Sequence, residues 1–101
     1  MNFVWLPEKE QDNIKKHGVN FPDAVQIFND PRRVERHDDD SSISEERWQT
    51  MGLAGKVLFV VYTERGEDTW IISARKAEPF ERRIYYEYSE IYPGGWERTD
   101  P

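Results

Sequence analysis

Residues 57–62 read Val-Leu-Phe-Val-Val-Tyr, an almost unbroken apolar run that predicts a central strand buried on both faces. A turn is predicted on either side of this strand: residues 54–56, which include Gly55, precede it, and residues 64–68, which include Gly66, follow it. Further strands are predicted at Arg47 to Leu53 and at Thr69 to Ala74. Because the connections are short, these strands should form an antiparallel meander.

Two helices are predicted ahead of the meander. Residues 2–5 form a short apolar strand, after which Pro7 suits the first turn of a helix and Gly18 supplies its left-handed end. Asn20 is the predicted N-cap of a second helix, which Asn29-Asp30-Pro31 ends. One face of this second helix carries apolar residues at i, i+3, i+4 and i+7, namely Phe21, Ala24, Val25 and Phe28.

A third helix is predicted after the meander, beginning at Pro79. Its apolar face comprises Phe80, Ile84, Tyr85, Tyr88 and Ile91. Pro93-Gly94-Gly95 should end this ordered part, so we expect a domain over residues 1–92 and a tail over residues 93–101. Trp96 leaves open whether the tail is flexible or docks. With a short strand at residues 33–37, the order is β-α-α-β-β-β-β-α, a small α+β domain with a mostly antiparallel sheet.

Composition limits the classes of function. The chain of 101 residues contains no Cys, which excludes disulfides and thiolate metal sites and is consistent with the cytoplasm. No apolar stretch approaches the roughly 20 residues of a membrane helix, and the N-terminus lacks the features of a signal peptide. The net charge of -6 opposes long-range attraction to nucleic acid, although basic pairs could form a local basic face. An acidic surface equally suits a basic partner.

Several kinds of site have no support in the sequence. No glycine pattern fits a phosphate loop, and no Ser stands in a Gly-x-Ser-x-Gly elbow. His37 precedes Asp38, Asp39 and Asp40, which invites a metal-site interpretation. A solvated, flexible acidic loop explains this segment better, so we expect neither a metal site nor a cofactor.

Cationic residues offer a more specific hypothesis. Cleavage of RNA through the ribose 2′-hydroxyl needs a base, an acid and positive charge on the phosphorane oxygens, which Arg, Lys, His and Glu side chains can supply. The candidates are Arg75, Lys76 and Arg82 near one strand-to-helix junction, Arg65 in a turn, Glu46 and Arg47 beginning a strand, and Lys16 and His17 at a helix end. Structural roles remain open: Arg75 can pair with a carboxylate such as Glu46, and His17 can complement the helix dipole.

The order of short motifs along the chain resembles the BrnT toxin family, the toxin half of a bacterial type II toxin–antitoxin pair. The resemblance covers roughly residues 2–88. The motifs that carry it are Phe3-Val4-Trp5 with Pro7 and Lys9; Lys16-His17-Gly18-Val19 with Phe21; Ala24, Phe28, Asp30 and Pro31; Glu46-Arg47-Trp48 with Gly52; residues 60–66; residues 71–77; and Glu81-Arg82-Arg83.

The resemblance implies a fold similar to the RelE-type ribonuclease toxins and metal-free cleavage of RNA that inhibits translation. It implies a BrnA-like antitoxin with a ribbon-helix-helix part, through which the complex binds operator DNA. It also implies catalytic roles for Arg75 first, then Lys76 and Arg65, with Glu46 and His17 as candidates for proton transfer. The residues then expected to contact RNA are Lys9, Lys16, Arg47 and Arg82.

One residue departs from the family pattern: Leu6 stands where an Asp usually precedes the helix-opening Pro, which removes an N-cap. The acidic loop at residues 38–46 and the tail after Ser89 are not assigned by the resemblance. The alternative hypothesis is a non-catalytic protein-binding module on the same fold, which binds a partner through its acidic face. A small interaction domain unrelated to RNA is the third.

Overall fold

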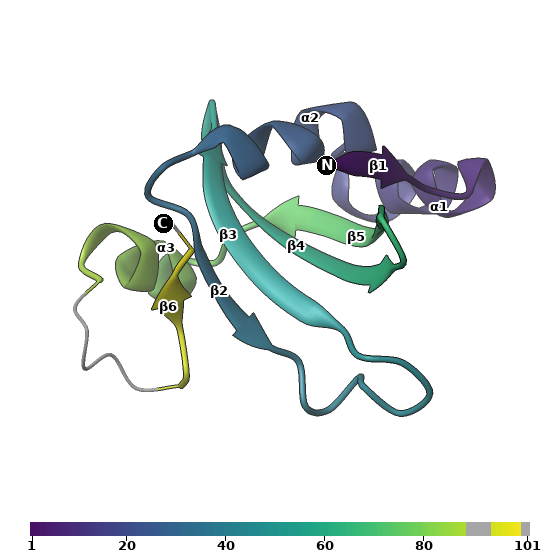
Figure 1. The fold of residues 1–101 in the computed structure, drawn as a ribbon. Coiled ribbons are helices and arrows are strands. Elements are labelled where there is room, and N and C mark those ends of the chain that lie inside the picture. The colour runs from purple at the N-terminus through teal and green to yellow at the C-terminus, as the bar shows by residue number, and fades with distance from the viewer. Residues whose placement is uncertain (89–93, 100–101) are drawn as a thin grey trace.

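A single sheet of six strands organises the chain, with helices packed on both of its faces (Figure 1). The structure is a computed structural model and describes residues 1–88 and 94–99. Its elements are β1 (Asn2–Val4), α1 (Pro7–His17), α2 (Phe21–Val25), the 3-10 helix η1 (Gln26–Asn29), β2 (Val34–His37), β3 (Trp48–Ala54), β4 (Lys56–Arg65), β5 (Asp68–Lys76), α3 (Pro79–Tyr86) and β6 (Glu97–Arg98). None of the helices in these residues has the length and apolarity needed to cross a membrane.

The strands lie in the order β1-β5-β4-β3-β2-β6, and every neighbouring pair is antiparallel except β1 with β5. The predicted meander is β3–β4–β5, turned by Gly55 and Gly66, which both have positive φ. The mixed α+β class with three α-helices is confirmed. One element was not predicted, β6, because a strand of two residues is too short to produce a periodic pattern.

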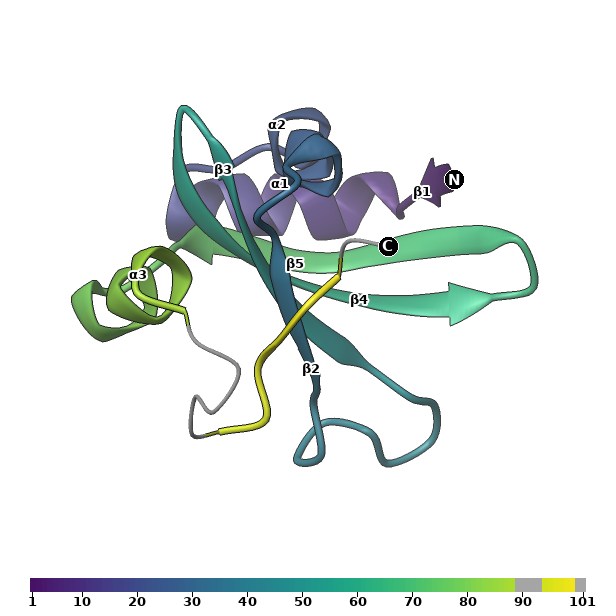
Figure 2. The same ribbon diagram turned by 60° about the vertical axis from the view of Figure 1, so that its left-hand side comes forward.

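The first core lies between the sheet and the layer of α1, α2 and η1 (Figure 2). The predicted second helix is α2 followed by η1, and Asn20 caps it by accepting a hydrogen bond from the Asp23 N–H at 2.8 Å. Phe21, Ala24 and Ile27 are buried there against alternate residues of β4. Of the predicted apolar stripe, Val25 and Phe28 are only partly buried, and Ile27 of the 3-10 helix is fully buried instead.

The second core lies on the opposite face of the sheet, under α3 and residues 94–99. Tyr85 of α3 and Trp96 are buried beside Phe59 of β4. The third helix ends at Tyr86 and is thus shorter than predicted; Ile91 lies outside the described residues. Phe80, placed on the predicted apolar face, is exposed. It lies at the second position of α3.

Candidate functional site

A groove runs along the flank of α1 where this helix meets β5. It consists of two adjoining hollows that share Leu6, Lys9 and Ile72, and we call it the α1 groove. The first hollow adds Glu45, Arg47, Arg65, Trp70 and Ile71; the second adds Glu8, Asp12, Asn13, Lys16, His17 and Ser73. The groove therefore brings together several residues predicted from the sequence, namely Lys9, Lys16, His17, Arg47 and Arg65.

The helical period places the α1 residues on this flank. Lys9, Asn13 and Lys16 stand at i, i+4 and i+7, so their side chains leave one side of the helix. Gly18 ends the helix in the left-handed conformation, with φ 69° and its N–H donating to the carbonyl of Ile14. As expected from Leu6, no side chain caps the first turn.

Asn13 fixes α1 to the outer edge of β5. Its Nδ2 donates to the carbonyls of Val19 at 2.9 Å and Ala74 at 2.8 Å, and its Oδ1 accepts from the Ala74 N–H at 3.0 Å. Within the described residues, β1 accompanies β5 only as far as Trp70, so the Asn13 amide takes the place of a neighbouring strand at Ala74. A single Asn in a polar helix carries no sequence pattern that would have revealed this role.

Glu45 and Arg65 form a two-point ion pair in the first hollow. Nε of Arg65 lies 3.1 Å from Oε2 of Glu45, and Nη2 lies 3.0 Å from Oε1. The Arg65 guanidinium also stacks on Trp70, with 4.9 Å between Cζ and the ring centroid. The hydrogen bonds with Arg65 lower the pKa of Glu45 and raise the pKa of Arg65, so both groups stay charged.

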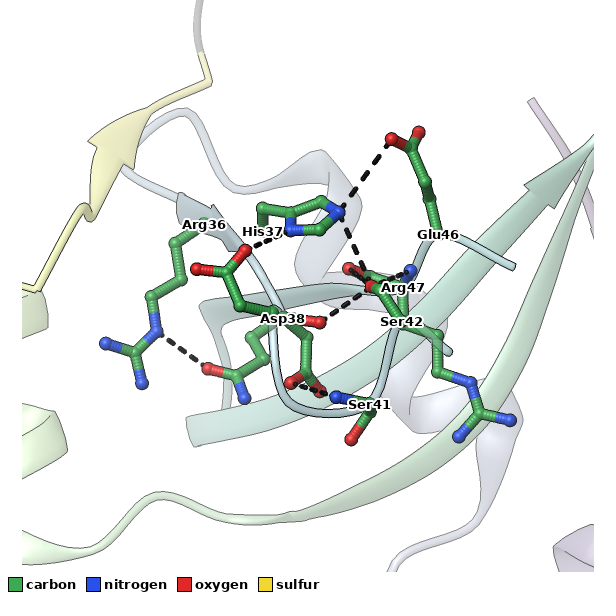
Figure 3. A network of polar contacts seen from close by, with 9 residues as sticks. Arg36, His37, Asp38, Ser41, Ser42, Glu46 and Arg47 are labelled. Atoms are coloured by element: carbon green, nitrogen blue, oxygen red, sulfur yellow. Dashed lines mark hydrogen bonds and ion pairs between the residues drawn. The ribbon is translucent and has the colours of Figure 1, made fainter. Parts of the chain in front are cut away.

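Glu45 is the acid that lines the groove, whereas the acid predicted from the sequence is its neighbour Glu46. The Glu46 carbonyl accepts a hydrogen bond from Thr63 Oγ1 at 2.6 Å, which fixes the backbone here, and its side chain turns away from Arg65 toward His37. Its Oε1 lies 3.9 Å from Nε2 of His37. Figure 3 shows the two side chains facing each other. Sequence alone does not distinguish two adjacent acids that point to opposite sides.

Arg75 lies on the sheet face of the second core, at the end of β5 that leads into α3. Its guanidinium donates to Glu81 of α3 at 2.7 and 2.9 Å and stacks on Phe59, with 4.2 Å between Cζ and the ring centroid. The predicted structural alternative, that Arg75 pairs with a carboxylate, is confirmed, but the partner is Glu81 and not Glu46. Phe59 faces Arg75 in the β4–β5 register, and Arg65 stands six residues further along β4, which separates the two arginines by about 20 Å.

Arg75, Lys76 and Arg65, which the resemblance names together as catalytic, therefore do not meet in one pocket. In an antiparallel pair the end of β5 faces the beginning of β4, so residues 75–76 and residue 65 lie at opposite ends. Lys76 is exposed outside the α1 groove. Arg82 is also outside it, with Nη1 donating to the Ala77 carbonyl at 2.9 Å beside the first turn of α3.

A hydrogen-bonded network orders the loop between β2 and β3 (Figure 3). Ser42 Oγ accepts from the Arg47 N–H at 2.8 Å and donates to the Asp38 carbonyl at 2.7 Å. His37 Nδ1 lies 2.5 Å from Asp39 Oδ1, and His37 Nε2 lies 3.4 Å from Ser42 Oγ. These residues resemble a Ser-His-Asp constellation. The Ser42 hydroxyl, however, donates its proton to the Asp38 carbonyl and not to His37 Nε2, which lies farther away. The network therefore anchors the loop rather than activating a nucleophile.

The acidic loop is more ordered than the sequence indicated. The side chain of Asp38 is buried and accepts the Ser41 N–H at 3.2 Å, instead of lying in solvent with its neighbours. Across residues 1–88 and 94–99, no three His, Asp or Glu side chains gather in a way that could hold a metal ion. The loop instead positions Glu45 and Arg47 at the α1 groove.

Comparison with known proteins places the groove within a region that related chains share. The family model described as "Ribonuclease toxin, BrnT, of type II toxin-antitoxin system" matches residues 5–81. Among solved structures, the chain is similar to the ribonuclease toxin BrnT of Brucella abortus, with 26% sequence identity and a TM-score of 0.59. That match covers 77% of this chain and 97% of the Brucella chain. No curated protein matches the sequence.

Proposed function

The chain belongs to the family of BrnT ribonuclease toxins of type II toxin–antitoxin systems, and on this premise we propose that it cleaves RNA held along the α1 groove. The proposal includes cleavage without a metal ion, inhibition of translation, and action in the cytoplasm. It retains a fold related to the RelE-type toxins. The observation that carries it is the gathering of Lys9, Arg47 and Arg65 in one hollow, continued along α1 by Lys16 and His17.

An extended single strand of RNA fits the arrangement of the cations. Lys9 and Lys16 are seven residues apart on α1, so their backbone positions differ by about 10 Å along the helix and suit different phosphates. Within the described residues, Arg47 Nε is buried without a hydrogen-bond partner. Trp70 adds an aromatic surface beside the cations, a combination that suits stacking of an unpaired base.

Proton transfer is assigned to His17, which shares the second hollow with Lys16. Imidazole exchanges protons readily near neutral pH, whereas the lowered pKa of Glu45 makes that carboxylate a weak base. Lys16 and Lys9 then supply positive charge to the phosphate oxygens. Arg75 and Lys76 contribute only to RNA that extends beyond the groove, and Glu46 and Arg82 have no part in the chemistry.

Cleavage assays with a short single-stranded RNA in the presence of EDTA test this assignment. We expect His17→Ala to reduce the rate by about 100-fold or more with RNA binding retained. Lys9→Ala and Lys16→Ala should weaken binding, and each should reduce the salt dependence of log K by about 0.7. Lys56→Ala, an exposed lysine outside the groove, is the matched control. Loss of cleavage in Arg75→Ala with full activity in His17→Ala would overturn the site.

An antitoxin is the expected protein partner. We propose a BrnA-like protein with a ribbon-helix-helix part, which supplies the contacts to operator DNA. The net charge of -6 supports this division of roles, because an acidic toxin complements a basic partner better than it complements DNA. Co-expression with the neighbouring reading frame should relieve any growth arrest that the toxin causes. Persistent arrest together with no complex would contradict the pairing.

The alternative function is a non-catalytic binding module on the same fold. The pairing of Arg65 with Glu45 and of Arg75 with Glu81 favours it, because both guanidinium groups are already neutralised. A protein that binds antitoxin tightly and cleaves no RNA at any pH would support the module.

A further inference from the structure

Residues 94–99, the C-terminal segment, cover one edge of the sheet although they lie beyond the family match, which ends at residue 81. The Brucella toxin is covered over 97% of its length by a match that spans 77% of this chain. The edge strand β2 lies within the family match, whereas the segment that pairs with it lies outside that match.

The segment pairs with β2 through its backbone. Val34 faces Arg98 and Glu35 faces Glu97 in antiparallel register, and the Thr99 N–H donates to the Arg33 carbonyl at 3.2 Å. Hydrogen bonds to a strand edge are independent of side-chain identity, so any extended chain can make them. The two residue pairs are a short contact, and two acids lie opposite each other, which weakens it.

Trp96 supplies a specific anchor next to this pairing. Its side chain is only 3% exposed and enters the second core, with its ring centroid 6.0 Å from that of Phe59. The Arg36 guanidinium covers the indole, with 4.6 Å between Cζ and the ring centroid. A tryptophan in a desolvated pocket beside an arginine is typical of the residues that dominate protein–protein binding.

A second contact lies two residues beyond the anchor. The Arg98 guanidinium stacks on Tyr88, with 4.7 Å between Cζ and the ring centroid. On the other side of Trp96, Gly94 and Gly95 both have positive φ, at 94° and 77°. The backbone just before the anchor therefore has a conformation that favours glycine, and these two residues have no side chains to contact the site.

We propose that the C-terminal segment occupies, within its own chain, a docking site for an extended segment of a protein partner. The partner segment pairs with β2, places an aromatic side chain in the Trp96 pocket and stacks a cation on Tyr88 two residues later. The site suits a protein rather than RNA because its recognition elements are a strand edge and an apolar pocket. The inference goes beyond RNA cleavage and does not depend on it.

A peptide supplied in trans tests the site. The probe is a fluorescein-labelled peptide with the sequence of residues 94–101, and the receptors are the full-length wild-type chain and its Trp96→Ala variant. In the variant the internal competitor is weakened, so we expect the peptide to bind at least tenfold more tightly than to the wild type. A peptide with Ala in place of the Trp should bind neither chain. Absent or equal binding to a folded Trp96→Ala chain would overturn the proposal.

Hydrogen exchange of the wild-type chain provides a second test that requires no variant. If the segment is displaceable, the Thr99 amide should exchange through a local opening at least tenfold faster than the Val60 amide in the middle of β4. Exchange of both amides at one common rate would show that the segment leaves only when the whole domain unfolds. That result would refute the docking site even if Trp96→Ala failed to fold.

Discussion

Replacement of Asn13 by Ala should reveal how α1, and with it the groove, is held on the sheet. The side chain is buried and makes hydrogen bonds with the Val19 carbonyl and with both backbone groups of Ala74. Alanine removes all of these bonds and keeps the helix propensity high. The variant therefore isolates the loss of the amide from any effect on helix formation.

The expected cost follows from the hydrogen bonds. Each intramolecular hydrogen bond contributes about 1 kcal/mol net, and leaving a buried backbone group without a partner costs about 1–3 kcal/mol. We therefore expect Asn13→Ala to lower the free energy of unfolding by about 3 kcal/mol. Small domains have total stabilities of about 5–15 kcal/mol, so the effect should be large.

Urea denaturation followed by tryptophan fluorescence measures this loss. With a slope of about 1–3 kcal/mol per molar urea, the midpoint should fall by about 1–3 M. The control is Asp12→Ala on the exposed side of the same turn, which should change the free energy by no more than about 0.5 kcal/mol. A loss below about 1 kcal/mol for Asn13→Ala would refute the view that the amide substitutes for a strand at Ala74.

Three other substitutions test further contacts. Gly52→Ala would place a Cβ 2.7 Å from the Cβ of Ile27, so we expect a destabilisation of about 1–3 kcal/mol in urea melts, and unchanged stability would contradict this packing. Burial pushes the pKa of Asp30 upward, but hydrogen bonds from Tyr85 and two backbone N–H groups outweigh it and hold the pKa below its usual value. The stability that the ionised Asp30 contributes is present above its unfolded pKa of about 3.9 and is lost as the pH falls through its folded pKa. Tyr85→Phe should therefore lower the free energy of unfolding less at pH 2.5 than at pH 6. A loss of the same size at both pH values would exclude a role for the Tyr85–Asp30 hydrogen bond in this pH dependence. Arg75→Ala leaves a buried carboxylate on α3 without its partner and should destabilise the domain by about 2 kcal/mol while RNA affinity changes little; the opposite pattern would return Arg75 to the site.

The secondary structure near the chain's strongest local signals could be predicted from the sequence. The apolar run at residues 57–62 forms the middle of β4, Gly18 ends α1, and Asn20 caps α2, because each signal acts within a few residues. The weaker elements could not be predicted. The strand β6 forms because it pairs with the edge of β2 and because Trp96 packs into the second core. The edge and the core are built by residues far from residue 97 in the sequence.

The candidate site divides in the same way. The helix that carries Lys9, Lys16 and His17 could be predicted, because Pro7 and Gly18 mark its two ends by local rules. Which cations meet across the sheet depends on register, and the β4–β5 register places Arg65 and Arg75 at opposite ends. Contacts between residues distant in sequence arise only when strands pair and helices pack, so the grouping of charges in the groove was settled by the folded chain and not by any short stretch of it.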